Sequence, residues 1–142
     1  MAAAAAIGAT LASPANPPPM KLGAFSVSLS VKDIAASHAF YQKLGFKPVM
    51  GEEKQRWLIL RNGETTLGLF QGAFPRNTLT FNPGWDAKNQ PLPEFQDVRE
   101  LQCQLKAQGL KLDLEADEKT TGPATVMVTD PDGNPILLDQ HR

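Results

Sequence analysis

One succession of strand and helix signals occurs twice in this chain, and it constrains the fold more than any other feature. In the first copy, Phe25–Val31 alternates apolar and polar residues, which predicts a half-buried strand. Asp33 and Gly45 bound the helix that follows, as its N-cap and as the residue after its C-cap. A short strand over 46–50 and a hairpin over 56–70, with Asn-Gly at its turn, complete a β-α-β-β-β unit.

The second copy repeats this order with a longer connection. Thr78–Phe81 predicts a strand, and residues 82–96 contain three prolines, which predicts a long loop. Asp97 then caps a second amphipathic helix. A strand over 110–114 and a hairpin over 124–138, closed by an Asp-Pro-Asp-Gly turn, complete the second unit.

The repeat predicts one domain over residues 20–142, with an α+β fold of two tandem βαβββ modules at about 21–75 and 76–142. Residues 1–19 differ in kind, because they are rich in Ala and Pro and carry no charge. We expect a disordered tail there, or an upstream start codon with Met20 as the working start. The alternative is a cleaved targeting peptide, although the basic residues that begin a secretory signal are missing.

Composition narrows the possible partners. The formal net charge is −1, and the sequence has no basic cluster or basic amphipathic segment, so we expect neither nucleic acid nor a membrane as a partner. We expect a cytoplasmic protein. Hydrophobic residues make up 42% of the chain, enough for a core that needs no disulfide or metal. The single cysteine, Cys103, falls in the second predicted helix, where we expect a packing or surface role.

Short motifs in both copies carry a family likeness. They are Val31-Lys-Asp33, Ala39-Phe-Tyr41, Leu44-Gly-Phe46 and Asp130-Pro-Asp-Gly-Asn134. Over about residues 20–142 the chain resembles the vicinal oxygen chelate superfamily, which includes glyoxalases, bleomycin resistance proteins and extradiol dioxygenases. The resemblance implies that the two modules form a cupped mixed sheet around a cavity, and that the chain forms a homodimer. It leaves the function open, because one fold supports many activities.

Metal-dependent members of that superfamily hold a divalent ion with His, Gln or Glu side chains on the cavity-facing strands, leaving positions open for the substrate. By resemblance, the corresponding positions here are Ser26, Gly68, Leu137 and one residue within 77–79. None of them is His or Glu. We therefore expect no metal cofactor, and a divalent ion would need non-standard ligands.

Strand alternation also predicts which side chains face the cavity. Trp57 lies in the first hairpin, whereas Trp85 lies in the long loop, where it acts either as an anchor for the loop or as a lid. The alternative is that these side chains fill the space and bind nothing. The predicted ligand-binding residues are Ser26, Ser28, Trp57, Thr66, Gly68, Phe70, Trp85, Leu137 and Asp139.

Candidates for a catalytic acid or base are few. Asp139 shares the strand parity of Leu137, and His38 lies on the first helix. His141 is next to the C-terminus, where we expect fraying. We hypothesise a metal-free domain that binds a small molecule between its two modules. The alternative is a lyase, isomerase or dioxygenase resembling glyoxalase, with non-standard metal ligands or with Asp139 or His38 as a metal-independent general base.

Overall fold

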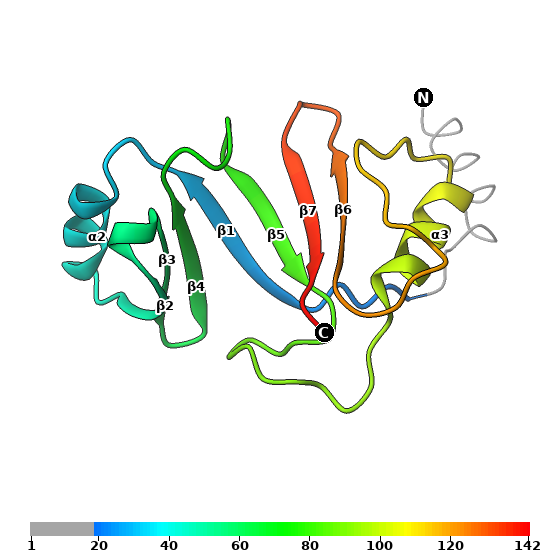
Figure 1. Cartoon of the computed structure of the whole chain (residues 1–142), viewed down its shortest axis with the longest axis horizontal. Coiled ribbons are helices and arrows are strands. Elements are labelled where there is room, and N and C mark those ends of the chain that lie inside the picture. The colour runs from blue at the N-terminus through cyan, green and yellow to red at the C-terminus, as the bar shows by residue number, and fades with distance from the viewer. Residues whose placement is uncertain (1–18) are drawn as a thin grey trace, which may run out of the picture.

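The computed structural model describes residues 19–142, so the tail predicted for residues 1–19 lies, apart from Pro19, outside the described residues. The strands are β1 Ala24–Ser30, β2 Lys47–Glu52, β3 Trp57–Asn62, β4 Thr65–Phe70, β5 Thr78–Asn82, β6 Ala124–Thr129 and β7 Pro135–Gln140. The helices are α2 Ile34–Gln42 and α3 Val98–Ala107, with a short 3₁₀ turn, η2 Glu53–Gln55. The strands form one seven-stranded sheet in the order β2-β3-β4-β1-β5-β7-β6 (Figure 1).

The centre of the sheet is the antiparallel pair β1–β5, in which Val27 lies opposite Leu79. On either side of this pair the next contact is parallel, β1 with β4 and β5 with β7. The hairpins β3–β4 and β6–β7 continue the sheet outward, and α2 and α3 lie toward its two ends (Figure 1). The two halves therefore have matching arrangements, and the predicted α+β fold with a cupped mixed sheet is confirmed.

Each helix packs on its own half of the sheet and forms a separate core. Ile34 of α2 packs with a cluster that includes Leu60 and Leu69, both fully buried. Val98 and Leu101 of α3 pack with Val126 and Leu138. Because side chains alternate along a strand, the residues between these core positions point to the opposite face. No helix within residues 19–142 is long and apolar enough to cross a membrane.

The strand predicted over residues 110–114 is wrong, and the second half has one strand fewer than expected. The segment makes a single bridge, between Leu114 and Met127. Pairing does not extend beyond Leu114, because the backbone groups of Ala116 are taken by the buried side chain of Gln102 on α3. The Oε1 of Gln102 accepts from the Ala116 N–H at 2.7 Å, and its Nε2 donates to the Ala116 carbonyl at 3.0 Å.

Candidate functional site

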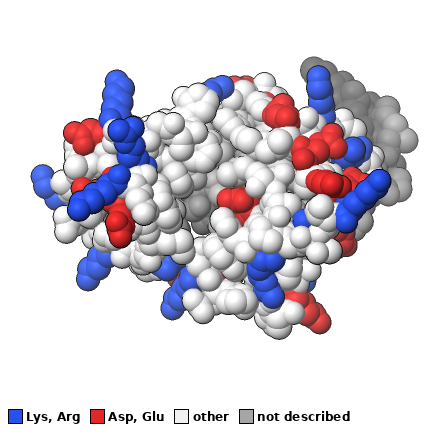
Figure 2. Space-filling model, in the orientation of Figure 1, with Lys and Arg blue, Asp and Glu red and all other residues white. Residues whose placement is uncertain are grey.

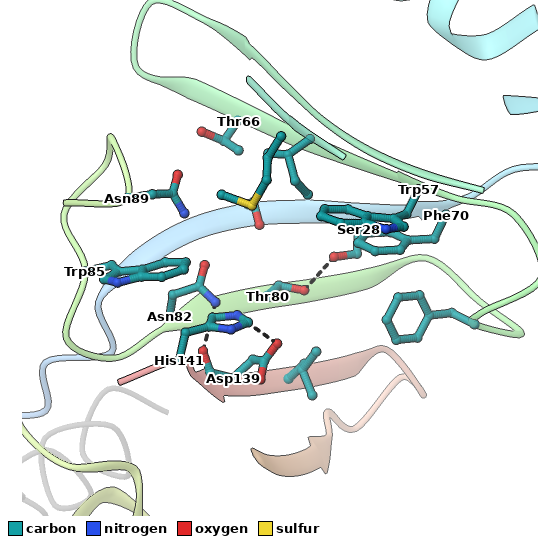
Figure 3. A pocket seen from close by; sticks show the side chains of 15 residues that line it. Ser28, Trp57, Thr66, Phe70, Thr80, Asn82, Trp85, Asn89, Asp139 and His141 are labelled. Atoms are coloured by element: carbon teal, nitrogen blue, oxygen red, sulfur yellow. Dashed lines mark hydrogen bonds and ion pairs between the residues drawn. The ribbon is translucent and has the colours of Figure 1, made fainter. Parts of the chain in front are cut away.

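The face of the sheet turned away from the helices holds a cavity of about 340 Å³. Figure 2 shows a hollow in the middle of the molecule, with most of the charged side chains toward the two ends. The lining comes from both halves of the sheet and from the loop after β5 (Figure 3). It consists of Ser26, Ser28, Met50, Trp57, Ile59, Thr66, Phe70, Phe74, Thr80, Asn82, Trp85, Asn89, Leu137, Asp139 and His141.

One wall of the cavity is aromatic. Trp57 on β3 and Phe70 on β4 are directly paired across the two strands, and both side chains reach the cavity. The ring of Phe74 packs edge-on against Phe70, with centroids 5.1 Å apart and planes at 81°. Ser30 holds the Phe74 segment in place, because its hydroxyl donates to the Phe74 carbonyl at 2.7 Å.

The floor of the cavity carries small polar groups that already have partners. The hydroxyls of Ser28 on β1 and Thr80 on β5 are hydrogen-bonded to each other at 2.7 Å. Asn82 donates from its side-chain amide to the Asp139 carbonyl at 2.8 Å, which ties β5 to the end of β7. These contacts satisfy buried polar atoms, and they fix the floor as a rigid surface.

The opposite wall is a stacked pair of rings beside a carboxylate. Trp85 and His141 lie face to face, with centroids 4.6 Å apart and planes at 10° (Figure 3). His141 Nε2 lies 3.1 Å from Asp139 Oδ2, and Thr125 donates to Asp139 Oδ1 at 3.2 Å. The prediction that His141 frays is wrong, because the stack and the ion pair both hold its ring.

The two members of the ion pair shift each other's pKa. Hydrogen bonding to Asp139 raises the pKa of His141, and the carboxylate charge adds to this against the opposing effect of burial. Burial raises the pKa of Asp139, but the hydrogen bond and charge of His141, together with the Thr125 hydroxyl, outweigh it and leave the pKa below its ordinary value. Asp139 is therefore ionised at neutral pH, and His141 is the group that titrates.

Trp85 is held in position through its backbone. The Ala24 N–H donates to its carbonyl at 3.0 Å, and its own N–H donates to the Asn82 carbonyl at 3.2 Å. Arg142 then ties the loop to the C-terminus, since its guanidinium donates to the Gly84 carbonyl at 3.1 Å. Gly84 has a φ of +92°, and a Cβ there would lie 2.9 Å from Arg142 Cδ, so this close approach requires glycine. These contacts favour the anchor interpretation of Trp85 over the lid.

Comparison with sequence models of protein families identifies the family of this chain. The model of the glyoxalase/bleomycin resistance protein/dioxygenase superfamily matches residues 23–138, which is most of the chain. The chain belongs to this superfamily. No curated protein sequence matches the chain.

Solved structures agree with this assignment at the level of the fold. A member of the same superfamily from Vibrio splendidus 12B01 is 18% identical, with a TM-score of 0.57 over 82% of this chain and 97% of that one. A protein described as an NAD-dependent benzaldehyde dehydrogenase from Legionella pneumophila is 17% identical, with a TM-score of 0.62 over 83% and 99%. Homoprotocatechuate 2,3-dioxygenase from Arthrobacter globiformis is 20% identical, with a TM-score of 0.52 over 88% of this chain but only 37% of that one.

The strand registers show how the residues at the expected metal-ligand positions are arranged in the sheet. Parallel pairing puts Ser28 beside Gly68 in the first half and Thr80 beside Leu137 in the second. A superposition of the two halves that matches Ser28 with Thr80 also matches Gly68 with Leu137.

The same superposition gives a candidate for the fourth position, which the resemblance places within 77–79. Ser26 lies opposite Thr80, and Ser28 lies opposite Thr78. Because Ser28 corresponds to Thr80, Ser26 corresponds to Thr78, whose hydroxyl already donates to a backbone carbonyl at 3.1 Å. With this match, the positions that the resemblance assigns to metal ligands are Ser26, Gly68, Thr78 and Leu137.

These residues do not fit a divalent ion. They offer two hydroxyls, an aliphatic side chain and a glycine, whereas protein sites for divalent ions are built on carboxylate, imidazole or thiolate side chains, which carbonyl oxygens and waters supplement. At Gly68 the space itself is taken, since a Cβ there would lie 2.5 Å from Cε2 of Phe70. Within residues 19–142, no group of three or more His, Cys, Asp or Glu side chains could hold a metal ion.

The structure brings together most of the residues predicted from strand alternation. All of the predicted ligand-binding residues except Gly68 line the cavity. Gly68 lies between Ser28 and Ile59 on the same sheet, without a side chain to contribute. His38 does not line the cavity; it lies on α2 and pairs with Glu53 of η2.

Sequence reasoning missed the remaining lining residues for separate reasons. Ile59 and Thr80 were within reach, because the period-two rule applied to β3 and β5 includes them. Met50 follows a register shift in the β2–β3 ladder, so alternation misplaces it. Asn89 and His141 lie outside the strands, in a loop and past the last strand, where no periodic signal exists.

Proposed function

We propose that this chain is a metal-free domain that binds a small, planar aromatic molecule in the cavity between its two halves. One observation carries the proposal: a cavity of about 340 Å³ has an aromatic wall at Trp57 and Phe70, and a second at Trp85 and His141. Few polar groups interrupt these walls. Concave sites of this size and composition are typical of small-molecule binding.

The metal-free part of the proposal rests on the donor set. Serine, glycine, threonine and leucine stand where related metalloenzymes carry imidazole and carboxylate groups. Elemental mass spectrometry on protein purified without a chelator or affinity tag tests it. We expect much less than one metal ion per chain, and a stoichiometric transition metal would overturn this part.

The binding part is tested with a neutral bicyclic probe, naphthalenemethanol, by calorimetry. Trp57→Ala removes a ring from the cavity wall, and we expect about a tenfold loss of affinity, since an aromatic contact contributes roughly 1 kcal/mol beyond its buried area. Phe40→Ala is the matched control, because Phe40 is an exposed aromatic residue on α2. Equal losses in the two variants would contradict binding in the cavity.

A second candidate is metal-independent proton transfer, and the ion pair of His141 and Asp139 favours it. A base oriented by a carboxylate is the usual arrangement for abstracting a proton. In this candidate the free Nδ1 of His141 removes a proton from a carbon beside a ligand carbonyl, and returns one to the same or a neighbouring atom. Acetonaphthone in deuterated water tests it by proton NMR. We expect the protein to accelerate deuteration of the methyl group, and His141→Gln to abolish the acceleration; no acceleration removes this candidate.

The homodimer that the resemblance implies stays a proposal. Within residues 19–142 the edge strand β2 pairs only with β3, and the edge strand β6 pairs with β7 and is otherwise bridged only at Met127 by Leu114. Val49 and Met50 on β2 are exposed apolar side chains. Light scattering coupled to size-exclusion chromatography measures the state, and a monomeric mass across micromolar concentrations would contradict the dimer.

A further inference from the structure

We propose that the cavity selects a planar aromatic ligand with a positively charged group, which Asp139 binds, and that protonation of His141 weakens this binding by neutralising the charge of that carboxylate. The inference rests on the proposed function, because it assumes that the cavity takes a ligand. It adds the chemical class of that ligand and the residue that controls its affinity.

The cavity lining contains two ionisable side chains, which form one ion pair. Among the residues that line it, only Asp139 and His141 are ionisable, and none is Lys or Arg. Figure 2 shows acidic atoms beside the hollow. Whenever His141 is neutral, the lining therefore carries one uncompensated negative charge. Such a site favours a cation over a neutral molecule of the same shape, and disfavours an anion.

The carboxylate of Asp139 has room for a further donor. Its two oxygens together offer about four acceptor positions. The protein fills one position on each oxygen, from His141 at 3.1 Å and from Thr125 at 3.2 Å. The Asp139 side chain is still 31% exposed, in the wall of the cavity. An ammonium or amidinium group on the ligand can therefore bind Asp139 without displacing either protein donor.

The aromatic walls suit the same ligand. The faces of indole and benzene rings attract cations, and Trp57, Phe70 and Trp85 all line this cavity. A ligand that is both planar and positively charged uses the rings through stacking and the carboxylate through a charge-assisted hydrogen bond. A neutral planar ligand uses only the rings.

Protonation of His141 removes this advantage. The imidazolium neutralises Asp139, so a cationic ligand loses its electrostatic attraction, whereas a neutral ligand is unaffected. The affinity for a cation is therefore expected to rise as pH rises through the pKa of His141, which its hydrogen bond to Asp139 raises.

The other groups around the pair do not alter this expectation. β6 contributes the uncharged Thr125, and β5 contributes the uncharged Asn82. In the loop, the carboxylate of Asp86 accepts from the backbone N–H groups of Lys88 and Gln90. Arg142 directs its guanidinium to the carbonyls of Gly84 and Leu92, and Arg61 directs its own to Thr66 and Asn89. Asp139 is the only charged group that shifts the pKa of His141.

Three probes with one ring system test the inference: naphthylmethylamine, naphthalenemethanol and naphthoate, which are cationic, neutral and anionic. Calorimetry on the alkaline side of the His141 titration is expected to give roughly tenfold tighter binding of the amine than of the alcohol, with naphthoate weakest. At about pH 5.5, we expect the preference for the amine to fall to within roughly threefold.

Variants of Asp139 and His141 test whether these two residues cause the preference for the amine. Asp139→Asn is expected to remove the preference for the amine, and Asp132→Asn, an exposed turn residue, is expected to keep it. His141→Gln is expected to bind the amine equally well at both pH values, and it keeps the test decisive if Asp139→Asn fails to fold. Equal affinities for amine and alcohol at the higher pH overturn the inference and leave the binding function intact. If none of the three probes binds, both proposals fail.

Discussion

The indole of Trp85 and the imidazole of His141 are stacked at 4.6 Å between centroids, with their planes 10° apart. The contact joins the loop after β5 to the residue that follows β7. It sets the plane of the imidazole so that Nε2 points to Asp139, 3.1 Å away. One side of the cavity therefore depends on a contact between two segments that are far apart in the sequence.

The stack makes His141 protonation visible in fluorescence, because an imidazolium in contact with an indole quenches its emission. We expect tryptophan emission to rise with pH, with a midpoint above the value of about 6.5 for free histidine. His141→Gln and Trp85→Phe should each remove the titration, whereas Trp57→Phe should keep it. A titration that persists in His141→Gln would contradict the assignment.

The ion pair also makes stability depend on pH, with a sign that follows from the pKa of His141. Asp139 raises this pKa in the folded state. The stabilisation is therefore fully present below the unfolded-state pKa, and is lost as pH rises through the folded-state pKa. We expect urea unfolding to show a larger difference between wild type and His141→Gln at about pH 5.5 than at about pH 9. The difference is small, because the His141 side chain is 44% exposed. A larger difference at the higher pH would be the wrong sign.

Gly68 is required by its neighbour Phe70. A Cβ at position 68 would lie 2.5 Å from Cε2 and 3.3 Å from Cζ of that ring. We expect Gly68→Ala to lower the free energy of unfolding by roughly 1–3 kcal/mol, because the ring must leave its place in the cavity wall. In a Phe70→Leu background, the same change should be close to neutral. Additive effects in this double-mutant cycle would show that the two positions do not interact.

The side chain of Gln140 ties the end of β7 to the start of α3. Its side chain is 1% exposed, and its Oε1 accepts from the Val98 N–H at 2.7 Å while its Nε2 donates to Asp97 Oδ2 at 2.9 Å. We expect Gln140→Leu to lower the free energy of unfolding by roughly 2 kcal/mol, since it leaves the start of α3 without these partners. Gln42→Leu, an exposed change at the end of α2, should have little effect. Comparable losses in the two variants would remove the special role of Gln140.

Local periodicity predicted the parts of the cavity that lie on regular strands. Ser26, Ser28, Leu137 and Asp139 follow the period-two rule, and all of them face the cavity. The strand predicted over 110–114 had the right composition, but it pairs with β6 only at Leu114. The backbone groups of Ala116, just beyond it, bind a glutamine on α3, which no local pattern reveals.

The wall formed by Trp85 and His141 could not be predicted from local sequence patterns. The contact of His141 with Trp85 depends on how the chain end meets the loop, and Arg142 fixes that meeting through the carbonyls of Gly84 and Leu92. Residues near a chain end usually lack such partners, which is why fraying was the expectation. Here the stacked ring of Trp85 and the half-buried carboxylate of Asp139 hold His141 in place.

The strand pairing of Ser26 and Leu137 indicates where a metal site could be introduced into the sheet. Ser26 and Leu137 both lie opposite Thr80 on the central strand, so they share one row of the sheet, two strands apart. Strand spacing separates their backbones by about 10 Å, a gap that a histidine and a glutamate can bridge around one ion. Ser28 is offset from that row by two residues, about 7 Å along the strand.

We therefore expect the double variant Ser26→His with Leu137→Glu to gain Zn²⁺ binding in the micromolar range, detected by calorimetry and by a Zn²⁺-dependent rise in melting temperature. Ser28→His with Leu137→Glu is the matched control, and it should bind Zn²⁺ at least tenfold more weakly because its ligands are out of register. Wild type should show no Zn²⁺-dependent shift. Equal Zn²⁺ affinity in the two variants would contradict the assignment of Ser26 and Leu137 as a pair of metal-ligand positions, even though the fold is the same.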